Sequence, residues 1–360
     1  MSITFSLGDR LVGSDQPPFI IAEMSGNHNQ SLDRALELVD AAAQAGAHAV
    51  KLQTYTADTI TLNVREGEFT ISDEKSLWKG NNLHDLYSKA YTPWEWHAPI
   101  MERAKAHGMM CFSSPFDESA VDFLLQLDVP AFKIASFENN HLPLIRKVAA
   151  TGKPMIISTG MASVAELGEA VAAAREGGCR DLVLLKCTSS YPAPPDDTNI
   201  RTIPHMRELF GCEVGLSDHT LGVGVSVASV ALGASVIEKH FTLARADGGV
   251  DSAFSLEPHE LAELVRTARI AQVAVGQPTY GSTASEASVL GNRRSLYVVK
   301  PVARGEALTL DNVRSIRPAR GIRPKHLDAV LGRRAVRDLA FGEPLAFEMI
   351  EGGADLGASA

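Results

Sequence analysis

The stretch Gly215-Leu-Ser-Asp-His-Thr220, read together with Val236-Ile-Glu-Lys-His-Phe241, decides the fold of this chain. Each is a short, apolar, partly β-branched run that ends in polar residues, and each carries one histidine, His219 or His240, near its downstream end. If the two runs are neighbouring parallel strands of a closed barrel, both imidazoles project from one rim, where they could hold a divalent ion. Two histidines alone are a weak metal motif, because most histidines are solvated or hydrogen-bonded to protein.

The charge balance and the cysteines favour a soluble protein that acts on small molecules. The 360 residues carry 34 basic and 43 acidic side chains, a formal net charge of -9, which argues against a nucleic-acid binder. The four cysteines show no CxxC spacing and indicate a reduced, cytoplasmic protein. The amino terminus lacks a basic segment followed by a long apolar run, and no apolar run approaches ~18 residues. We therefore expect neither export nor a membrane span.

One unit recurs along most of the chain: a short apolar run that ends in a polar residue, a loop, and a segment of helical period. Eight such runs are predicted as strands, at residues 19–25, 47–53, 109–115, 131–136, 154–160, 182–189, 212–219 and 235–241. Helices are predicted at residues 32–45, 93–107, 118–127, 163–176, 222–232 and 258–275. Buried strands that alternate with helices indicate an α/β protein with a parallel (β/α)8 TIM barrel in residues 1–276. The alternative is an open doubly wound sheet, but no GxGxxG follows the first strand.

The pattern changes after residue 276. Residues 277–292 are rich in Ser, Thr, Gly and Ala without a clear period, which is a linker composition. From residue 293 onward, short alternating runs such as Ser295-Leu-Tyr-Val-Val299 are separated by turns, which predicts a small β-rich domain at 293–350. The Gly- and Ala-rich segment 351–360 is predicted to be a disordered tail. Because so small a domain buries little surface, we expect it to pack on the barrel of its own or of a partner subunit.

Polar side chains gather at the downstream ends of the predicted strands, which in a barrel form the catalytic face. They are Glu23, Ser25, Lys51, Gln53, Ser113, Ser114, Lys133, Ser136, Glu138, Ser158, Thr159, Thr188, Ser189, Tyr191, Ser217, His219, Glu238 and His240. A single lysine there would usually extend to water, but Lys51 and Lys133 follow apolar runs at equivalent positions. Because buried charges need partners, two interior lysines indicate an anion between them, a phosphate or a carboxylate.

Eight motifs follow one another along the chain: Ala22-Glu23, Lys51-Leu-Gln53, Ser113-Ser-Pro-Phe116, Phe132-Lys-Ile-Ala-Ser136, Ser158-Thr-Gly160, Cys187-Thr-Ser-Ser-Tyr-Pro192, Leu216-Ser-Asp-His-Thr220 and Glu238-Lys-His-Phe241. In this order they resemble the sialic acid synthase family. Those enzymes condense phosphoenolpyruvate with an N-acetylated amino sugar to give nine-carbon nonulosonic acids. The resemblance extends to the carboxyl-terminal domain, because Arg293-Arg-Ser-Leu-Tyr297 and Ile316-Arg-Pro318 resemble the family's antifreeze-like (SAF) module. It implies a carbon–carbon bond-forming transferase.

Two further segments bear on the sugar that such an enzyme would accept. Gly248-Gly-Val-Asp-Ser-Ala-Phe-Ser-Leu-Glu-Pro258 and Leu77-Trp-Lys-Gly80 resemble the pseudaminic acid synthase branch of the family. This resemblance implies 2,4-diacetamido-2,4,6-trideoxy-L-altrose, which lacks the 6-hydroxyl of N-acetylmannosamine. The alternative is an N-acetylneuraminic or legionaminic acid synthase that uses an N-acetylmannosamine-type sugar, because specificity depends on the shape of the pocket.

The resemblance also implies roles for individual residues. His219 and His240 match two ligands of a divalent ion, Mn²⁺ with Mg²⁺ or Co²⁺ as alternatives, and Glu23 matches a carboxylate that handles a proton. The residues that match the phosphoenolpyruvate site are Lys51, Ser114, Lys133, Ser136, Ser158, Ser189 and Ser217, with Ser189 standing where the sialic acid enzymes have Asn. Those that match the sugar site are Gln53, Glu138, Tyr191, Asp251 and Arg317. Arg317 matches an arginine that reaches into the barrel of the other subunit, which implies a homodimer.

Two other functions fit parts of the sequence. An aldolase on the same barrel would use Lys133 as a Schiff base, in place of a metal-dependent condensation. The carboxyl-terminal domain could instead bind ice or carbohydrate, which would require a flat face rich in threonine. Residues 293–350 contain few threonines and many arginines, so a cover over an anionic site is the better prediction.

Two groups of side chains admit simpler structural roles. Trp94 and Trp96 begin a predicted helix, so the tryptophans, including Trp78, are predicted to pack in the protein and not to stack on a sugar. Asp218 either hydrogen-bonds a neighbouring strand or orients the adjacent His219, and the sequence does not decide between these roles.

Overall fold

The chain forms two compact units, which we describe separately. The computed structural model describes residues 4–74 and 76–357, and the units are Met1–Gly276 and Gln277–Ala360. Within the described residues, no helix combines the length and the low polarity that a membrane span requires.

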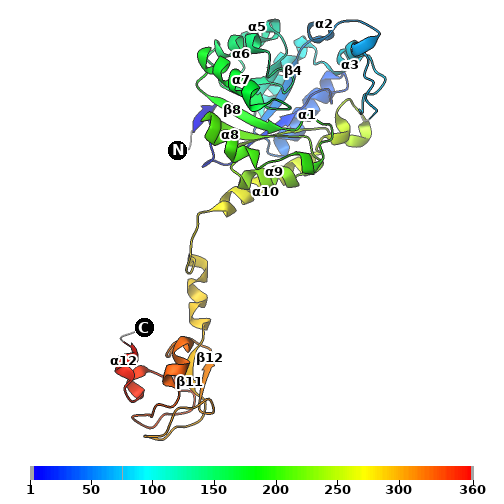
Figure 1. The fold of residues 1–360 in the computed structure, drawn as a ribbon. Helices are drawn as coiled ribbons and strands as arrows, with labels where there is room; N and C mark the ends of the chain where they lie inside the picture. Colours follow the sequence, from blue (N-terminus) through cyan, green and yellow to red (C-terminus); the bar gives the residue numbers. More distant parts are fainter. Residues whose placement is uncertain (1–3, 75, 358–360) are drawn as a thin grey trace. The chain divides into compact units, whose positions relative to one another are not determined.

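The first unit contains a closed barrel of eight parallel strands, which confirms the predicted fold (Figure 1). The strands are β3 (Phe19–Glu23), β4 (Ala49–Thr54), β5 (Met110–Pro115), β6 (Phe132–Ile134), β7 (Met155–Ser158), β8 (Leu182–Cys187), β9 (Glu213–Asp218) and β10 (Val236–His240). Each coincides with one of the eight predicted runs. Sequential strands are neighbours, and β10 pairs with β3 to close the barrel.

Helices follow the strands along the chain, and the six that the sequence predicts are all present. The helices are α1 (Leu32–Gln44), α2 (Ala57–Ile60), α3 (Leu83–Ala90), α4 (His97–Ala106), α5 (Glu118–Gln126), α6 (Leu142–Ala149), α7 (Val164–Glu176), α8 (Thr202–Phe210), α9 (Gly224–Ala231) and α10 (Pro258–Val275), with short 3-10 turns η1 (Gly67–Phe69), η2 (Trp94–Trp96), η3 (Pro195–Asp197), η4 (Arg245–Asp247) and η5 (Ser252–Phe254). Side chains cap the predicted starts: Ser31 accepts from the Arg34 N–H, and Ser163 forms a capping box with Glu166. The sequence did not predict α2, α3, α6 and α8, which are short.

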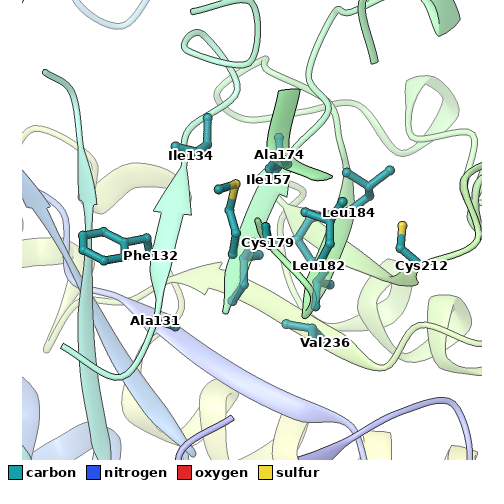
Figure 2. Packing of buried hydrophobic residues seen from close by; sticks show 14 of the residues in the cluster. Ala131, Phe132, Ile134, Ile157, Ala174, Cys179, Leu182, Leu184, Cys212 and Val236 are labelled. Carbon is teal, nitrogen blue, oxygen red and sulfur yellow. The ribbon is translucent and has the colours of Figure 1, made fainter. Parts of the chain in front are cut away.

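Side chains alternate between the two faces of each strand, so successive residues point into different surroundings. In β3, Ile21 belongs to a large cluster that fills the barrel and continues under α5 to α8, and Ile20 packs with α1 and α10. Figure 2 shows part of the large cluster, to which Phe132 and Ile134 of β6, Ile157 of β7 and Leu182 and Leu184 of β8 belong. Ile134 pairs with Ile157 in the register of the two strands. One face of each strand is therefore directed inward, and its last inward residues surround the carboxyl end of the barrel.

A hairpin that the sequence did not predict precedes the barrel. Strands β1 (Phe5–Leu7) and β2 (Arg10–Val12) pair antiparallel. Leu7 and Val12 are buried in the same cluster as Phe19, the first residue of β3, and Gly8 lies against Met110 at the start of β5. The hairpin therefore covers the amino-terminal end of the barrel.

The second unit is small and β-rich. It contains η6 (Ala284–Asn292), β11 (Ser295–Val298), β12 (Val313–Ile316), η7 (Pro324–His326), α11 (Leu327–Val330), η8 (Phe347–Met349) and α12 (Gly353–Gly357) around an apolar cluster. Part of the predicted linker is thus helical, because Thr283 and Glu286 form a capping box at the start of η6. Part of the predicted disordered tail is also helical, at 353–357, and residues 358–360 lie outside the described residues.

Candidate active site

A cavity of about 750 Å³ opens at the carboxyl end of the barrel. The predicted site residues that line it are Glu23, Lys51, Gln53, Lys133, Ser136, Glu138, Ser158, Ser189, Tyr191, Ser217, His219, His240 and Asp251. Ser114 is not among the lining residues, but its hydroxyl contacts Lys51. Arg317 follows β12 in the second unit and is exposed there. The structure therefore brings together every predicted site residue of the first unit, within a volume typical of small-molecule sites.

Two lysines and two glutamates form a buried network at the base of the cavity. Lys51 Nζ lies 2.5 Å from Glu23 Oε2, 3.2 Å from Ser114 Oγ and 3.8 Å from Glu238 Oε1. Lys133 Nζ lies 3.2 Å from the same oxygen of Glu238. The sequence predicted an anion between the two lysines, and in the structure the protein's own Glu238 contributes one. Its second oxygen, Oε2, is buried without a hydrogen-bond partner.

Within this network the Glu23 carboxyl group has a pKa close to neutral pH. Burial raises the pKa of Glu23 from 4.5 to about 7, with Lys51 opposing the rise and Glu238 adding to it. Burial lowers the pKa of Lys133, whereas the two lysines together hold the pKa of Glu238 below its usual value against the effect of burial. Gln53 donates to Glu23 Oε1 over 2.9 Å and fixes its orientation. Glu23 is thus a buried carboxyl group that can hold or release a proton near pH 7.

A set of hydroxyl groups lies beside the lysines. Ser189 Oγ donates to Ser136 Oγ over 2.8 Å, and Ser158 Oγ is buried without a hydrogen-bond partner. Gly160 has φ +50°, and a Cβ there would lie 2.7 Å from the Cβ of Ser136 and 3.0 Å from Ser189 Oγ. The Asn139 side chain donates to the backbone carbonyl of Ser158 over 3.3 Å. Only glycine fits the crowded turn at position 160. The unpaired Ser158 hydroxyl and the ammonium groups of Lys51 and Lys133 are donors of the kind that bind an anion.

The rings of His219 and His240 lie next to each other at the cavity wall, edge-on, with ring centroids 5.4 Å apart. His219 Nδ1 donates to the Thr188 carbonyl over 2.8 Å, and the same ring hydrogen-bonds Cys187. Burial lowers the pKa of His219, but the bonds to Cys187 and Thr188 raise it overall above its ordinary value. Burial, with the nearby positive charges, lowers the pKa of His240 well below 6.5, and its Nδ1 is buried without a hydrogen-bond partner, 3.8 Å from Asp251. Among the described residues, no three His, Cys, Asp or Glu side chains are arranged to hold a metal ion. Two imidazoles that each bind through an unprotonated nitrogen fit an ion whose other ligands are water and substrate oxygens.

Aromatic and aliphatic side chains surround the opening of the cavity. The Tyr191 ring lies 4.4 Å from the ring of His219 and 5.8 Å from that of Trp78, between centroids. Trp78 Nε1 donates to the Val250 carbonyl over 2.9 Å. The apolar lining residues are Tyr55, Ile60, Ile71, Leu77, Trp78, Leu83, Leu86, Tyr87, Phe116, Phe137 and Val250. Most of them come from residues 55–93, which we call the β4–α4 segment.

The tryptophans divide between the two roles considered from the sequence. Trp94 stacks on Phe123 with centroids 4.6 Å apart, and Trp96 packs edge-on against His28, so both have the packing role that was predicted. Trp78 lines the cavity instead. The strand and helix pattern gave no signal of this, whereas the resemblance carried by Leu77-Trp-Lys-Gly80 had already connected this segment with the sugar.

Glu238 was predicted to lie at the catalytic face, but no role was predicted for it, and none was predicted for Cys187. Glu238 precedes His240 by two residues on one strand, so the two share a face. Cys187, the last residue of β8, lines the cavity and contacts His219 and Ser189.

Comparisons with known proteins agree with this geometry. A model described as the NeuB family matches residues 38–280, more than half of the chain, and one described as the SAF domain matches residues 293–351. The chain belongs to the NeuB family. The family and the SAF module that the ordered motifs predicted are therefore confirmed.

Individual members of the family are similar over most of the chain. The pseudaminic acid synthase of Campylobacter jejuni is 44% identical over 335 residues, which cover 92% of this chain and 96% of that protein. The N,N'-diacetyllegionaminic acid synthase of the same species is 37% identical over 327 residues, covering 89% and 96%. A crystal structure of the N-acetylneuraminic acid (sialic acid) synthetase of Leptospira borgpetersenii, in complex with citrate, has a TM-score of 0.71 and 32% identity, covering 81% of this chain and 96% of that chain.

Proposed function

We propose that the protein is a pseudaminic acid synthase. It condenses phosphoenolpyruvate with 2,4-diacetamido-2,4,6-trideoxy-L-altrose and releases phosphate, giving a nine-carbon nonulosonic acid. The observation that carries the proposal is one cavity in which two lysines and a hydroxyl cluster lie beside two imidazoles, under an apolar opening. Membership of the NeuB family supports the reaction, and the 44% identity to the Campylobacter jejuni enzyme supports the acceptor.

Phosphoenolpyruvate binds at the base of the cavity in this proposal. Lys51 and Lys133 contact its phosphate and carboxylate, because ammonium groups in a buried site bind oxyanions strongly. Ser158, whose hydroxyl has no hydrogen-bond partner in the protein, donates to the same anion, as do Ser136 and Ser189 at the glycine turn. Ser114 and Ser217 support the cluster by contacting Lys51 and Glu238, 3.2 and 3.3 Å away.

His219 and His240 hold a divalent ion, Mn²⁺ in the first instance, with Mg²⁺ or Co²⁺ as alternatives. Burial and the nearby positive charges lower the pKa of His240, which keeps its ring neutral, and the bond from His219 Nδ1 to the Thr188 carbonyl directs the other ring. The pKa of His219 is raised, so binding of the ion would release the proton that this ring holds. When bound, the ion supplies Lewis-acid activation of the sugar aldehyde.

Glu23 carries the proton chemistry. C3 of phosphoenolpyruvate forms a bond to the aldehyde carbon, whose oxygen takes up a proton from water, and this leaves positive charge at C2. A water molecule then adds to C2 and gives one proton to Glu23, whose pKa of about 7 suits a general base at neutral pH. The C2–O bond to phosphate breaks as the added hydroxyl becomes the ketone, the proton of that hydroxyl leaves with the phosphate, and Lys51 and Lys133 stabilise the departing group.

The acceptor lies between the imidazoles and the opening of the cavity. Gln53, Glu138, Tyr191 and Asp251 supply its polar contacts, and the apolar residues of the β4–α4 segment cover its acetamido groups and its C6 methyl group. A sugar with a 6-hydroxyl group would place that hydroxyl against apolar side chains. The second candidate function, an N-acetylneuraminic or legionaminic acid synthase, is favoured by the 37% identity to the legionaminic enzyme.

The proposal includes a cytoplasmic homodimer in which Arg317 of the SAF domain reaches the barrel of the other subunit. The exposed position of Arg317 on the second unit is compatible with such a contact. The four cysteines are free and buried, which supports a reducing compartment.

The decisive experiment supplies phosphoenolpyruvate with a panel of 2-acetamido and 2,4-diacetamido hexoses and measures phosphate release. We expect the diacetamido-trideoxy sugar to exceed N-acetylmannosamine by roughly 10–200-fold in kcat/KM. EDTA should abolish turnover and Mn²⁺ should restore it. A preference for N-acetylmannosamine would select the second candidate, and borohydride trapping of pyruvate on Lys133 would select the aldolase.

A further inference from the structure

A buried ion pair lies behind the two strands that carry His219 and His240. Lys239 Nζ is 3.1 Å from Asp218 Oδ2, and the two side chains are 0% and 1% exposed. Successive side chains of a strand point to opposite faces. Because His219 and His240 line the cavity and Asp218 and Lys239 do not, the pair lies on the outer face of the barrel.

The pair joins β9, β10 and α9, and every proton of the Lys239 ammonium group is hydrogen-bonded. Besides Asp218, the Lys239 ammonium group donates to the carbonyls of Thr220 over 2.6 Å and Gly222 over 2.9 Å, so its three protons have three acceptors. Asp218 accepts from the Thr220 N–H over 2.9 Å and from the Ser226 hydroxyl of α9 over 2.5 Å. Each proton of the Lys239 ammonium group therefore has an acceptor within the protein, and none is left for a substrate.

The contacts hold the chain on both sides of His219. The residue before it is Asp218 and the residue after it is Thr220, and both are bound to Lys239. Lys239 itself immediately precedes His240, and it pairs with Asp218 in the β9–β10 register. The ring of His219 is oriented separately, through its bond to the Thr188 carbonyl. A shift of the loop that follows β9 would therefore change the separation of the two imidazoles.

We propose that Asp218 and Lys239 are positioning residues that fix the two imidazoles at the separation a divalent ion requires. This inference rests on the proposed metal role of His219 and His240. Neither Asp218 nor Lys239 touches the substrates in the proposed reaction, so they act only through the histidines beside them. Of the two roles considered for Asp218, the structure shows the first, because Asp218 bonds Lys239 of the neighbouring strand. Its effect on the His219 imidazole passes through the backbone that joins the two residues.

The same strand offers a matched control at its other end. Glu213 begins β9, is fully buried, and pairs with Arg207 Nη2 over 2.9 Å. Both Lys239→Met and Arg207→Met leave a buried carboxylate of β9 without its cation, and both should lower the unfolding temperature. Only Lys239→Met does so next to the histidines.

The test measures Mn²⁺ binding to the purified full-length chain from the electron paramagnetic resonance signal of free Mn²⁺. Lys239→Met should raise the Kd for Mn²⁺ by about tenfold or more, as losses of support behind metal ligands do. Ser226→Ala, which removes one bond to Asp218 and leaves the charges paired, should raise it by a smaller factor. Arg207→Met should leave the Kd within twofold of the wild-type value.

The outcomes separate this inference from the proposed function. If Lys239→Met lowers the unfolding temperature and leaves the Kd unchanged, the pair is only structural and the inference is wrong. If Lys239→Met does not fold, Ser226→Ala decides, and an unchanged Kd in that variant rejects the inference. If the wild-type chain binds no Mn²⁺, the proposed metal site fails and the inference fails with it.

Discussion

The two compact units treat their charged side chains in opposite ways. In the barrel unit, Glu23, Lys51, Lys133 and Glu238 are each at most 4% exposed. In the part of the second unit that the structure describes, no Asp, Glu, Lys, Arg or His is buried, and its ion pairs, such as Arg337 with Glu343, lie at the surface.

This difference indicates where the chemistry takes place. Removing a charged group from water costs several kcal/mol even after relaxation, and burial of apolar surface could stabilise a barrel without it. The second unit does fold around an apolar cluster alone. In the proposed function, the buried lysines of the barrel unit bind the phosphoenolpyruvate anion, and this role would explain why they are kept out of water. The second unit can contribute to the reaction only through side chains that it exposes, among which Arg317 is the predicted one.

The largest effect is expected from removing a buried ammonium group. Lys51→Met should lower kcat/KM for phosphoenolpyruvate by about 10³-fold, because the variant loses charge stabilisation of the departing phosphate in a buried site. Arg337→Met, which breaks the exposed pair of the second unit, should change kcat/KM by less than twofold. A loss of less than tenfold in a folded Lys51→Met variant would show that the buried charges serve the fold and not the reaction.

The pH dependence should identify the base. Because burial raises the pKa of Glu23 to about 7, its proton-accepting carboxylate form is lost as the pH falls below 7, and kcat should fall with it. Glu23→Gln should lower kcat by about 10²-fold and should remove the fall of kcat below pH 7, which is the acidic limb of the pH profile. Burial also raises the pKa of Glu138 to about 7, so Glu138→Gln is the control and should keep the limb. If the limb disappears in Glu138→Gln and remains in Glu23→Gln, the base is Glu138.

The contribution of the second unit is expected to be smaller. Arg317→Ala should lower kcat/KM for the sugar by about 30-fold, the loss of one charged hydrogen bond, and the exposed Arg314→Ala should have no effect. Mixing Lys51→Met and Arg317→Ala proteins should then restore activity, because a mixed dimer contains one complete site. If mixing restores nothing while subunits exchange, Arg317 acts on its own barrel or not at all.

The smallest expected effect concerns the choice of sugar. Trp78→Ala should reduce the preference for a 6-deoxy sugar over its 6-hydroxy analogue by about tenfold, because one apolar wall of the opening is removed. Trp94→Ala, which disrupts a stack on Phe123, should lower stability and keep the preference. An unchanged preference in Trp78→Ala would leave the apolar opening without a role in selection.

The barrel and most of its site could be predicted because both depend on local pattern. Each strand ends where an apolar run meets a polar residue, and a parallel barrel necessarily gathers those ends, which is why Lys51 and Lys133 were found together with His219. The part of the site that was missed depends on tertiary contacts. Trp78 reaches the opening because its indole N–H bonds the distant Val250 carbonyl, and no periodicity of the β4–α4 segment encodes that contact.

The role of Glu238 could not be predicted for a different reason. Its position at a strand end was evident, but its role depends on two lysines from other strands meeting at one of its oxygens. The register of the strands around the barrel brings the two lysines to Glu238, and the sequence of β10 alone does not determine that register.

The hairpin of β1 and β2 has a consequence for the kinetics. Since it covers the amino-terminal end of the barrel, both substrates must enter and the product must leave through the same opening. The lysines lie at the base of this single passage and the sugar contacts lie above them, so a sugar that arrived first would block the way. Phosphoenolpyruvate should therefore bind before the sugar, in a compulsory order, and excess sugar should act as a dead-end inhibitor.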